Sequence, residues 1–119
     1  MQLRSLIFAA ILSVSAHAQE QVPQPGARLE QLQQRLNLTE DQRAKIRPIL
    51  VEEFMKVQAI RANYDGQTSR RSRLKMLREL RDVQQNLDKR VTPILTNEQR
   101  AEWKRIREER KEELREQRR

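Results

Sequence analysis

The sequence predicts an all-α protein, and three observations lead to this prediction. From residue 28 onward the chain is dominated by Leu, Gln, Glu, Arg and Lys, all of which favour helices. Apolar residues in this region recur at spacings of three and four, as on one face of a helix, and do not alternate as in a strand. Glycine is rare, with 2 copies in 119 residues. One domain of four helices is therefore expected.

The N-terminal region reads as a secretory signal peptide. Arg4 precedes an apolar run of about nine residues, and Ala16 and Ala18 supply a small-x-small cleavage signal. The run is shorter than the roughly 20 residues that a membrane-spanning helix needs. Export to the periplasm is therefore expected. The predicted regions are a cleaved signal peptide at 1–18, a flexible Pro- and Gln-rich leader at 19–27, and a helical domain at 28–119 with a frayed, charged C-terminus.

The first two helices follow the leader. The stripe of the short first helix is Leu29, Leu32 and Leu36. Asn37 is placed to end this helix, and Thr39 is a good N-cap for the next one. Gln42 stands where the partner in a capping box belongs, and the two residues between it and Thr39 are acids at the positive end of the helix dipole. The second helix should run to about Asn63.

A break that contains a glycine separates the second helix from the third. Ser69 or Thr68 can cap the third helix, which is expected from about Arg70 to Val91. Its expected apolar stripe is Leu74, Leu77, Leu80, Val83, Leu87 and Val91. Pro93 ends or kinks this helix, and Thr96 then caps the fourth.

The pattern Leu-Thr-x-x-Gln occurs twice, and each copy stands at a predicted helix start. Its residues are Leu38, Thr39 and Gln42, then Leu95, Thr96 and Gln99. A single copy would be a generic capping box, and we expect these residues to act as helix caps that position the functional surfaces. Two copies in an exported, cysteine-free, four-helix chain of this length form a more specific signature. On these residues the sequence resembles the Spy/CpxP family of periplasmic LTxxQ proteins.

The resemblance covers nearly the whole exported chain and implies both a fold and a function. The implied fold is an elongated, hairpin-like protomer that pairs antiparallel into a curved, cradle-like homodimer with a basic concave face. The implied function is ATP-independent chaperoning of unfolded envelope proteins. The alternative is a regulator that docks on the periplasmic domain of an envelope-stress sensor kinase. Other branches of the family bind metals through histidines, but the only histidine here, His17, lies in the signal peptide.

The composition argues against an enzyme, a metal sensor or a nucleotide-driven chaperone. Residues 19–119 contain no His and no Cys, so no serine has an imidazole to activate it. The glycines are isolated and do not form a phosphate-binding loop. We therefore expect no catalytic residue, no metal site and no cofactor. The formal net charge of +8 favours acidic proteins or, as a third alternative, an anionic membrane surface, whereas export argues against nucleic acid.

The second helix is expected to carry apolar residues on two opposite faces. The core face is predicted to be Ile46, Ile49, Leu50, Phe54, Val57, Ile60 and Tyr64. An apolar strip on the other side consists of Ala44, Val51, Met55, Ala59 and Ala62, with Pro48 among them. Three interpretations remain open for this strip: a dimer seam, which its small residues favour, a patch that contacts clients, or a surface that rests on the first helix.

A basic surface is expected on the third helix, opposite its leucine stripe. Its candidate client-binding residues are Arg71, Lys75, Arg78, Arg81 and Lys89, extended across the break by Arg61 and Arg70. Any one of them can be an ordinary solvated residue. As a group, they would steer acidic clients toward the protein, an attraction that fades as salt shortens the screening length below about 10 Å.

Overall fold

The computed structural model describes residues 24–117, and all regular elements in this part of the chain are helices, with no strand. Its elements are α1 (Pro25–Leu36), α2 (Glu40–Asn63), α3 (Arg70–Val91), the short 3-10 helix η1 (Thr92–Ile94) and α4 (Asn97–Gln117). The predicted all-α class and the four helices are therefore confirmed. The predicted signal peptide at 1–18 lies outside the described residues, as does most of the leader at 19–27.

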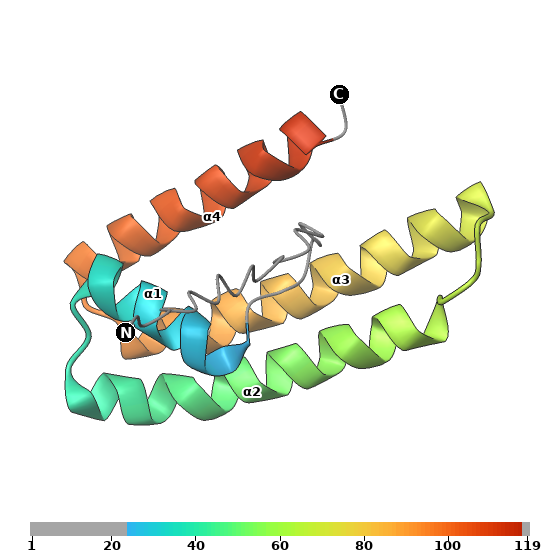
Figure 1. Cartoon of the computed structure of the whole chain (residues 1–119). Coiled ribbons are helices and arrows are strands. Elements are labelled where there is room, and N and C mark those ends of the chain that lie inside the picture. The colour runs from blue at the N-terminus through green and yellow to red at the C-terminus, as the bar shows by residue number, and fades with distance from the viewer. Residues whose placement is uncertain (1–23, 118–119) are drawn as a thin grey trace, which may run out of the picture.

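Helices α2 and α3 run antiparallel and side by side, and they form the long body of the molecule (Figure 1). α1 packs on α2 at the end away from the α2–α3 turn, and α4 starts at that same end and diverges from the body (Figure 1). The Cα radius of gyration is 19.4 Å, whereas a compact domain of this length has about 13 Å. The chain is therefore elongated and keeps much of its surface exposed.

The helix boundaries follow from local capping chemistry. α2 and α3 begin and end where the sequence predicts, and Ser69 rather than Thr68 caps α3 by accepting the backbone N–H of Ser72. Asn37 ends α1 in the left-handed conformation, with φ of 52°, and donates its backbone N–H to the Gln33 carbonyl at 2.9 Å. α1 starts at Pro25, three residues before the expected domain boundary, because proline suits the first turn of a helix.

The hydrophobic core lies at the end where all four helices meet, which we call the packed end. Its largest fully buried side chains are Trp103, Ile46, Leu50, Leu87 and Val91. α1 contributes its predicted leucine stripe to the same cluster. In contrast, no residue from 58 to 86 is buried. We call this segment the distal hairpin; it comprises the last turns of α2, the connecting turn and most of α3.

Leu74 is a correction to the predicted core stripe of α3, because 47% of it is exposed. Spacings of three residues turn a helix by 300°, so each such step moves the stripe back by about 60°. Two steps separate Leu74 from Leu80 and carry Leu74 about 120° around the helix, away from α2. Met76 is half-buried instead. The other predicted members of the stripe are half-buried or buried.

Candidate functional site

Both Leu-Thr-x-x-Gln motifs form capping boxes, as predicted. In the first, Thr39 Oγ1 accepts the backbone N–H of Gln42 at 3.1 Å, and Gln42 Oε1 accepts the backbone N–H of Thr39 at 3.0 Å. In the second, the corresponding distances between Thr96 and Gln99 are 3.3 Å and 2.9 Å. Both leucines that open the motifs, Leu38 and Leu95, are buried. The motifs therefore satisfy N–H groups that each helix start leaves without a partner.

The two motifs also bind each other, which the sequence analysis did not predict. Gln42 Nε2 donates to Gln99 Oε1 at 2.8 Å, and Gln99 Nε2 donates to Gln42 Oε1 at 3.0 Å. Each Nε2 donates a second bond to a backbone carbonyl near the other motif, from Gln42 to Ile94 at 3.0 Å and from Gln99 to Leu36 at 3.1 Å. Both amides thus use their full hydrogen-bonding capacity, and they join the start of α2 to the start of α4.

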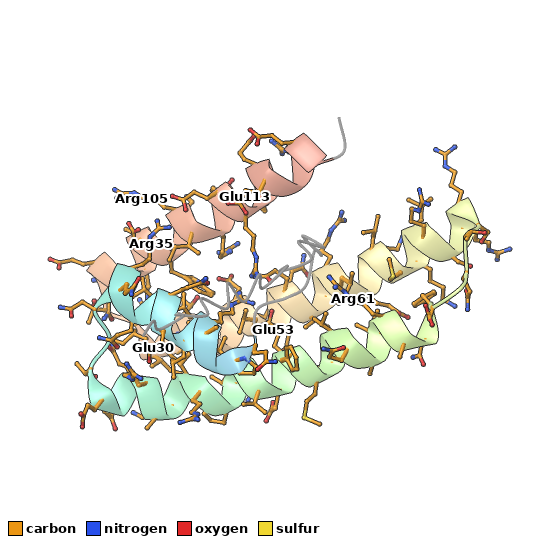
Figure 2. The ribbon with its side chains drawn as sticks, in the orientation of Figure 1. Glu30, Arg35, Glu53, Arg61, Arg105 and Glu113 are labelled. Atoms are coloured by element: carbon orange, nitrogen blue, oxygen red, sulfur yellow. The ribbon has the colours of Figure 1, made fainter. Side chains whose placement is uncertain are left out.

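A second set of contacts fixes the direction of α4. Oδ1 of Asp88 on α3 accepts hydrogen bonds from two side chains of α4, from Trp103 Nε1 at 2.8 Å and from Arg107 Nη1 at 2.8 Å. From the other side, Arg35 on α1 (labelled in Figure 2) contacts both Glu102 and Glu109. The shortest distances are 2.6 Å to Glu102 and 2.7 Å to Glu109. The hydrogen bond from Arg35 holds the pKa of Glu109 below its usual range. These contacts explain how α4 keeps its angle with little packing against α3.

A buried ion pair links α1 to α2. Arg28 and Glu53 are 6% and 7% exposed, and Arg28 Nη1 lies 3.2 Å from Glu53 Oε1. The pKa of Arg28 is lowered to about 10, first by burial and second by the nearby charge of Arg110 on α4, against the opposing effect of Glu53. Burial also raises the pKa of Glu53, although Arg28 opposes the shift. Desolvation therefore outweighs attraction for both partners.

Five arginines of the packed end form ion pairs between helices. The pairs are Arg28 with Glu53, Arg35 with Glu102 and Glu109, Arg43 with Glu30, Arg90 with Glu52, and Arg107 with Asp88. Each pair joins two different helices. The positive charge of these five arginines is therefore used to hold the fold together and is cancelled locally.

The candidate client-binding cations of α3 lie in a different electrostatic setting. All are exposed, and within residues 24–117 none of them forms an ion pair or a hydrogen bond through its side chain; they are Arg70, Arg71, Lys75, Arg78, Arg81 and Lys89. Arg61, the seventh candidate, lies on the distal part of α2 and contacts a neighbour (Figure 2). The structure thus brings six of the seven predicted residues onto one helix and leaves their charge available.

Leu74 lies inside this basic surface. Residues three and four apart are neighbours on a helix, so Arg70, Arg71 and Arg78 surround the exposed side chain of Leu74. Leu74 is not among the predicted site residues, because the leucine spacing of α3 assigns it to the core. The signal that could have found it is its angular position, since three successive steps of three residues cannot all share one buried face.

The first turn of α3 carries an unfavourable charge arrangement. It contains Arg70, Arg71 and Arg73 and no acidic residue. The N-terminus of a helix is the positive end of its dipole, so cations there cost about 0.3–1 kcal/mol each where acids would stabilise. By comparison, α2 has Glu40 and Asp41 in its first turn. The start of α3 is therefore less stable than its capping alone would make it.

The predicted apolar strip on α2 is exposed. Met55 and Val51 are 65% and 38% exposed, and Ala44, Ala59 and Ala62 are exposed as well. The interpretation that the strip rests on the first helix is therefore wrong, because α1 packs on a different face of α2. The dimer seam and the client patch remain as alternatives.

The described residues contain no group of three or more His, Cys, Asp and Glu side chains that could hold a metal ion. Among the described helices, none combines the length and the apolar character that crossing a membrane requires. Comparison with known proteins gives no further assignment, since no family model, no curated protein and no solved structure matches the chain.

Proposed function

We propose that this protein is an ATP-independent periplasmic chaperone of the Spy/CpxP type, which holds unfolded envelope proteins on the distal hairpin. One observation carries the proposal: Leu74 is exposed among arginines that have no partner in the described region, on a segment with no buried residue. This arrangement does not stabilise an isolated monomer, because Leu74 is left in contact with water and the arginines around it form no ion pair in the described region. A surface that is both basic and apolar does, however, suit an unfolded chain that exposes acidic and apolar side chains together.

The proposed mechanism has two stages. Unpaired cations attract an acidic client over a distance and speed its capture, which is a long-range effect and sensitive to salt. Apolar contacts at Leu74 then hold the client over short range. As the client folds it buries its own apolar side chains, so its contact area with the hairpin shrinks and it leaves. Nucleotide has no part in either stage.

We further propose that two copies pair antiparallel into an elongated, curved dimer through the strip on α2. Its support is the exposure of Met55 and Val51 beside alanines that allow close approach of two helices. The elongated shape, with a radius of gyration of 19.4 Å, leaves one protomer a thin core, which a second copy would extend. Sedimentation of the protein at several concentrations would test this pairing. A monomer at all of them would contradict it.

The test of the chaperone function is light scattering from an aggregating model client. Purified protein without residues 1–18 is added at substoichiometric and at stoichiometric ratios, without nucleotide, at low and at high salt. We expect scattering to fall with dose, and the protein to act more slowly at high salt because steering is screened. Unchanged scattering at both salt levels would contradict the chaperone function and favour docking on a sensor kinase. Binding to anionic vesicles without any effect on the client would favour a membrane function.

A further inference from the structure

A groove lies at the tip of the distal hairpin, where α2 ends and α3 begins. Its volume is about 440 Å³, and its walls include Asn63 and Tyr64 from the end of α2, Gln67 from the turn, and Arg71 and Lys75 from α3. A volume of this size accommodates one or two side chains of a peptide. The groove belongs to the same hairpin as Leu74, but neither Leu74 nor Arg78 lines it.

The carboxylate in the groove is already engaged. Glu79 lines the groove and accepts a hydrogen bond from the hydroxyl of Tyr64; burial first, and this bond second, raise the pKa of the tyrosine. Glu79 forms no ion pair with Arg71 or Lys75 in the described region. The groove therefore keeps a net positive charge.

Arg71 and Lys75 are suited to hold an anion together. They are four residues apart on α3 and thus neighbours on one helix face. Both are exposed, and neither side chain has a hydrogen bond or ion pair among residues 24–117. Two neighbouring cations repel each other. A carboxylate between them offsets this repulsion, because it can accept a charge-assisted hydrogen bond from each.

We propose that the tip groove binds an acidic side chain of an extended client peptide. Arg71 and Lys75 hold the carboxylate, while the ring of Tyr64 contacts an apolar side chain next to the acid. The inference rests on the proposed chaperone function and adds a defined recognition element to it: an Asp or Glu beside an aromatic or aliphatic residue. Charge complementarity selects this occupant, because the groove offers two unpaired cations and one engaged carboxylate.

The test is binding of a short, extended, fluorescently labelled peptide that carries Glu next to Phe, measured by anisotropy. A second peptide has Gln in place of Glu. Three proteins are compared: the natural protein, the groove variant Arg71→Gln with Lys75→Gln, and the matched control Arg78→Gln with Arg81→Gln. The control removes the same charge from the same helix, outside the groove. Circular dichroism verifies that both variants remain helical, as expected for exposed residues.

We expect the groove variant to bind the acidic peptide about tenfold or more weakly, and the control to lose much less affinity. The natural protein should bind the Gln peptide as weakly as the groove variant binds the Glu peptide. Equal losses in both variants would overturn the groove as a site, because binding would then depend on total charge. Binding to vesicles of phosphatidylethanolamine and phosphatidylglycerol, without binding of the peptide, would also overturn it.

The light-scattering assay separates failure of this inference from failure of the proposed function. If the natural protein suppresses aggregation while the groove variant binds the peptide as tightly as the natural protein does, the groove proposal fails and the chaperone function stands. If the natural protein does not suppress aggregation, the proposed function itself fails.

Discussion

The two motif glutamines show how one side chain can serve both a helix and the whole fold. Gln42 and Gln99 each complete a local capping box and also bond to each other. The capping role is local, so the sequence predicts it from the spacing of Thr and Gln alone. The cross-link depends on two segments more than fifty residues apart meeting in space, and no local pattern reports it.

Replacing either glutamine by alanine should destabilise the fold strongly. Gln42→Ala removes both hydrogen bonds between Gln42 and Gln99 and the hydrogen bond that Gln42 donates to the Ile94 carbonyl. The free energy of unfolding is therefore expected to fall by about 2–3 kcal/mol. The double variant with Gln99→Ala should lose less than the sum of the singles, because each single variant already breaks the shared bonds. Urea denaturation measures these losses, with the exposed Gln58→Ala as control. Additive losses would show that the amides act independently.

Arg70 illustrates a residue whose charge opposes the stability of its own helix. Arg70→Glu places an acid in the first turn of α3, which has none, and should stabilise the protein by about 0.3–1 kcal/mol at low salt. The same change should slow capture of an acidic client. Thermal unfolding and light scattering measure the two effects. Arg78→Glu, further along α3, is the control: it should slow capture without stabilising. Equal stabilisation by both variants would contradict the role of the helix dipole.

At the scale of elements, the buried pair of Arg28 and Glu53 fixes α1 to α2 at an energetic cost. Because burial raises the pKa of Glu53, the native state keeps its proton at pH values where the unfolded chain has lost it, so stability falls as pH rises above about 4.5. Because the pKa of Arg28 is lowered to about 10, stability recovers as pH rises beyond that value. The energetic cost of burying the two charged groups is therefore present between these two pH values.

An apolar replacement of the pair should therefore be tolerated. Glu53→Leu alone leaves Arg28 buried without its carboxylate and should cost about 3–5 kcal/mol at neutral pH. The double variant Arg28→Met with Glu53→Leu should be as stable as the natural protein, or more stable by about 1–4 kcal/mol. Its advantage should shrink on acidification, as Glu53 in the natural protein becomes neutral. Denaturation in urea at neutral and acidic pH gives these values. A double variant as unstable as the single would contradict the account.

The attachment of α4 should respond to loss of one hydrogen bond. Trp103→Phe keeps an aromatic ring in the core but removes the donor to Asp88, so a loss of about 1 kcal/mol is expected from the bond. Hydrogen exchange should become faster in α4 and remain unchanged in the distal part of α2. Uniform acceleration over both helices would show that Trp103 supports the whole core instead of anchoring α4.

The boundaries of the elements could be predicted from sequence far better than their surfaces. The starts of α2 and α4 follow from Thr39 and Thr96, whose capping is a local property. The exposure of Leu74 follows from its angular position on α3, but the burial of Glu53 could not be predicted, since it depends on where α1 packs on α2. The groove could not be predicted either, because it needs the end of α2 to meet Arg71 and Lys75.

The whole molecule divides into two ends with different electrostatic character. Ion pairs and the buried core hold the packed end together, whereas the distal hairpin has unpaired cations, half-buried apolar residues and the exposed Leu74. A small chain with no disulfide gains stability by burying its apolar residues. Their incomplete burial over nearly a third of the described chain is therefore explained by a partner that covers them.

Suppression of client aggregation by two charge-matched variants tests this division most directly. Arg78→Gln with Arg81→Gln removes two unpaired cations from the distal hairpin, and Arg47→Gln with Lys104→Gln removes two exposed cations from outside it. Both variants carry the same net charge. We predict that the distal variant suppresses light scattering clearly less well than the natural protein, while the other variant suppresses it equally well. Equal loss in both variants would contradict a localised client surface and leave only the net charge.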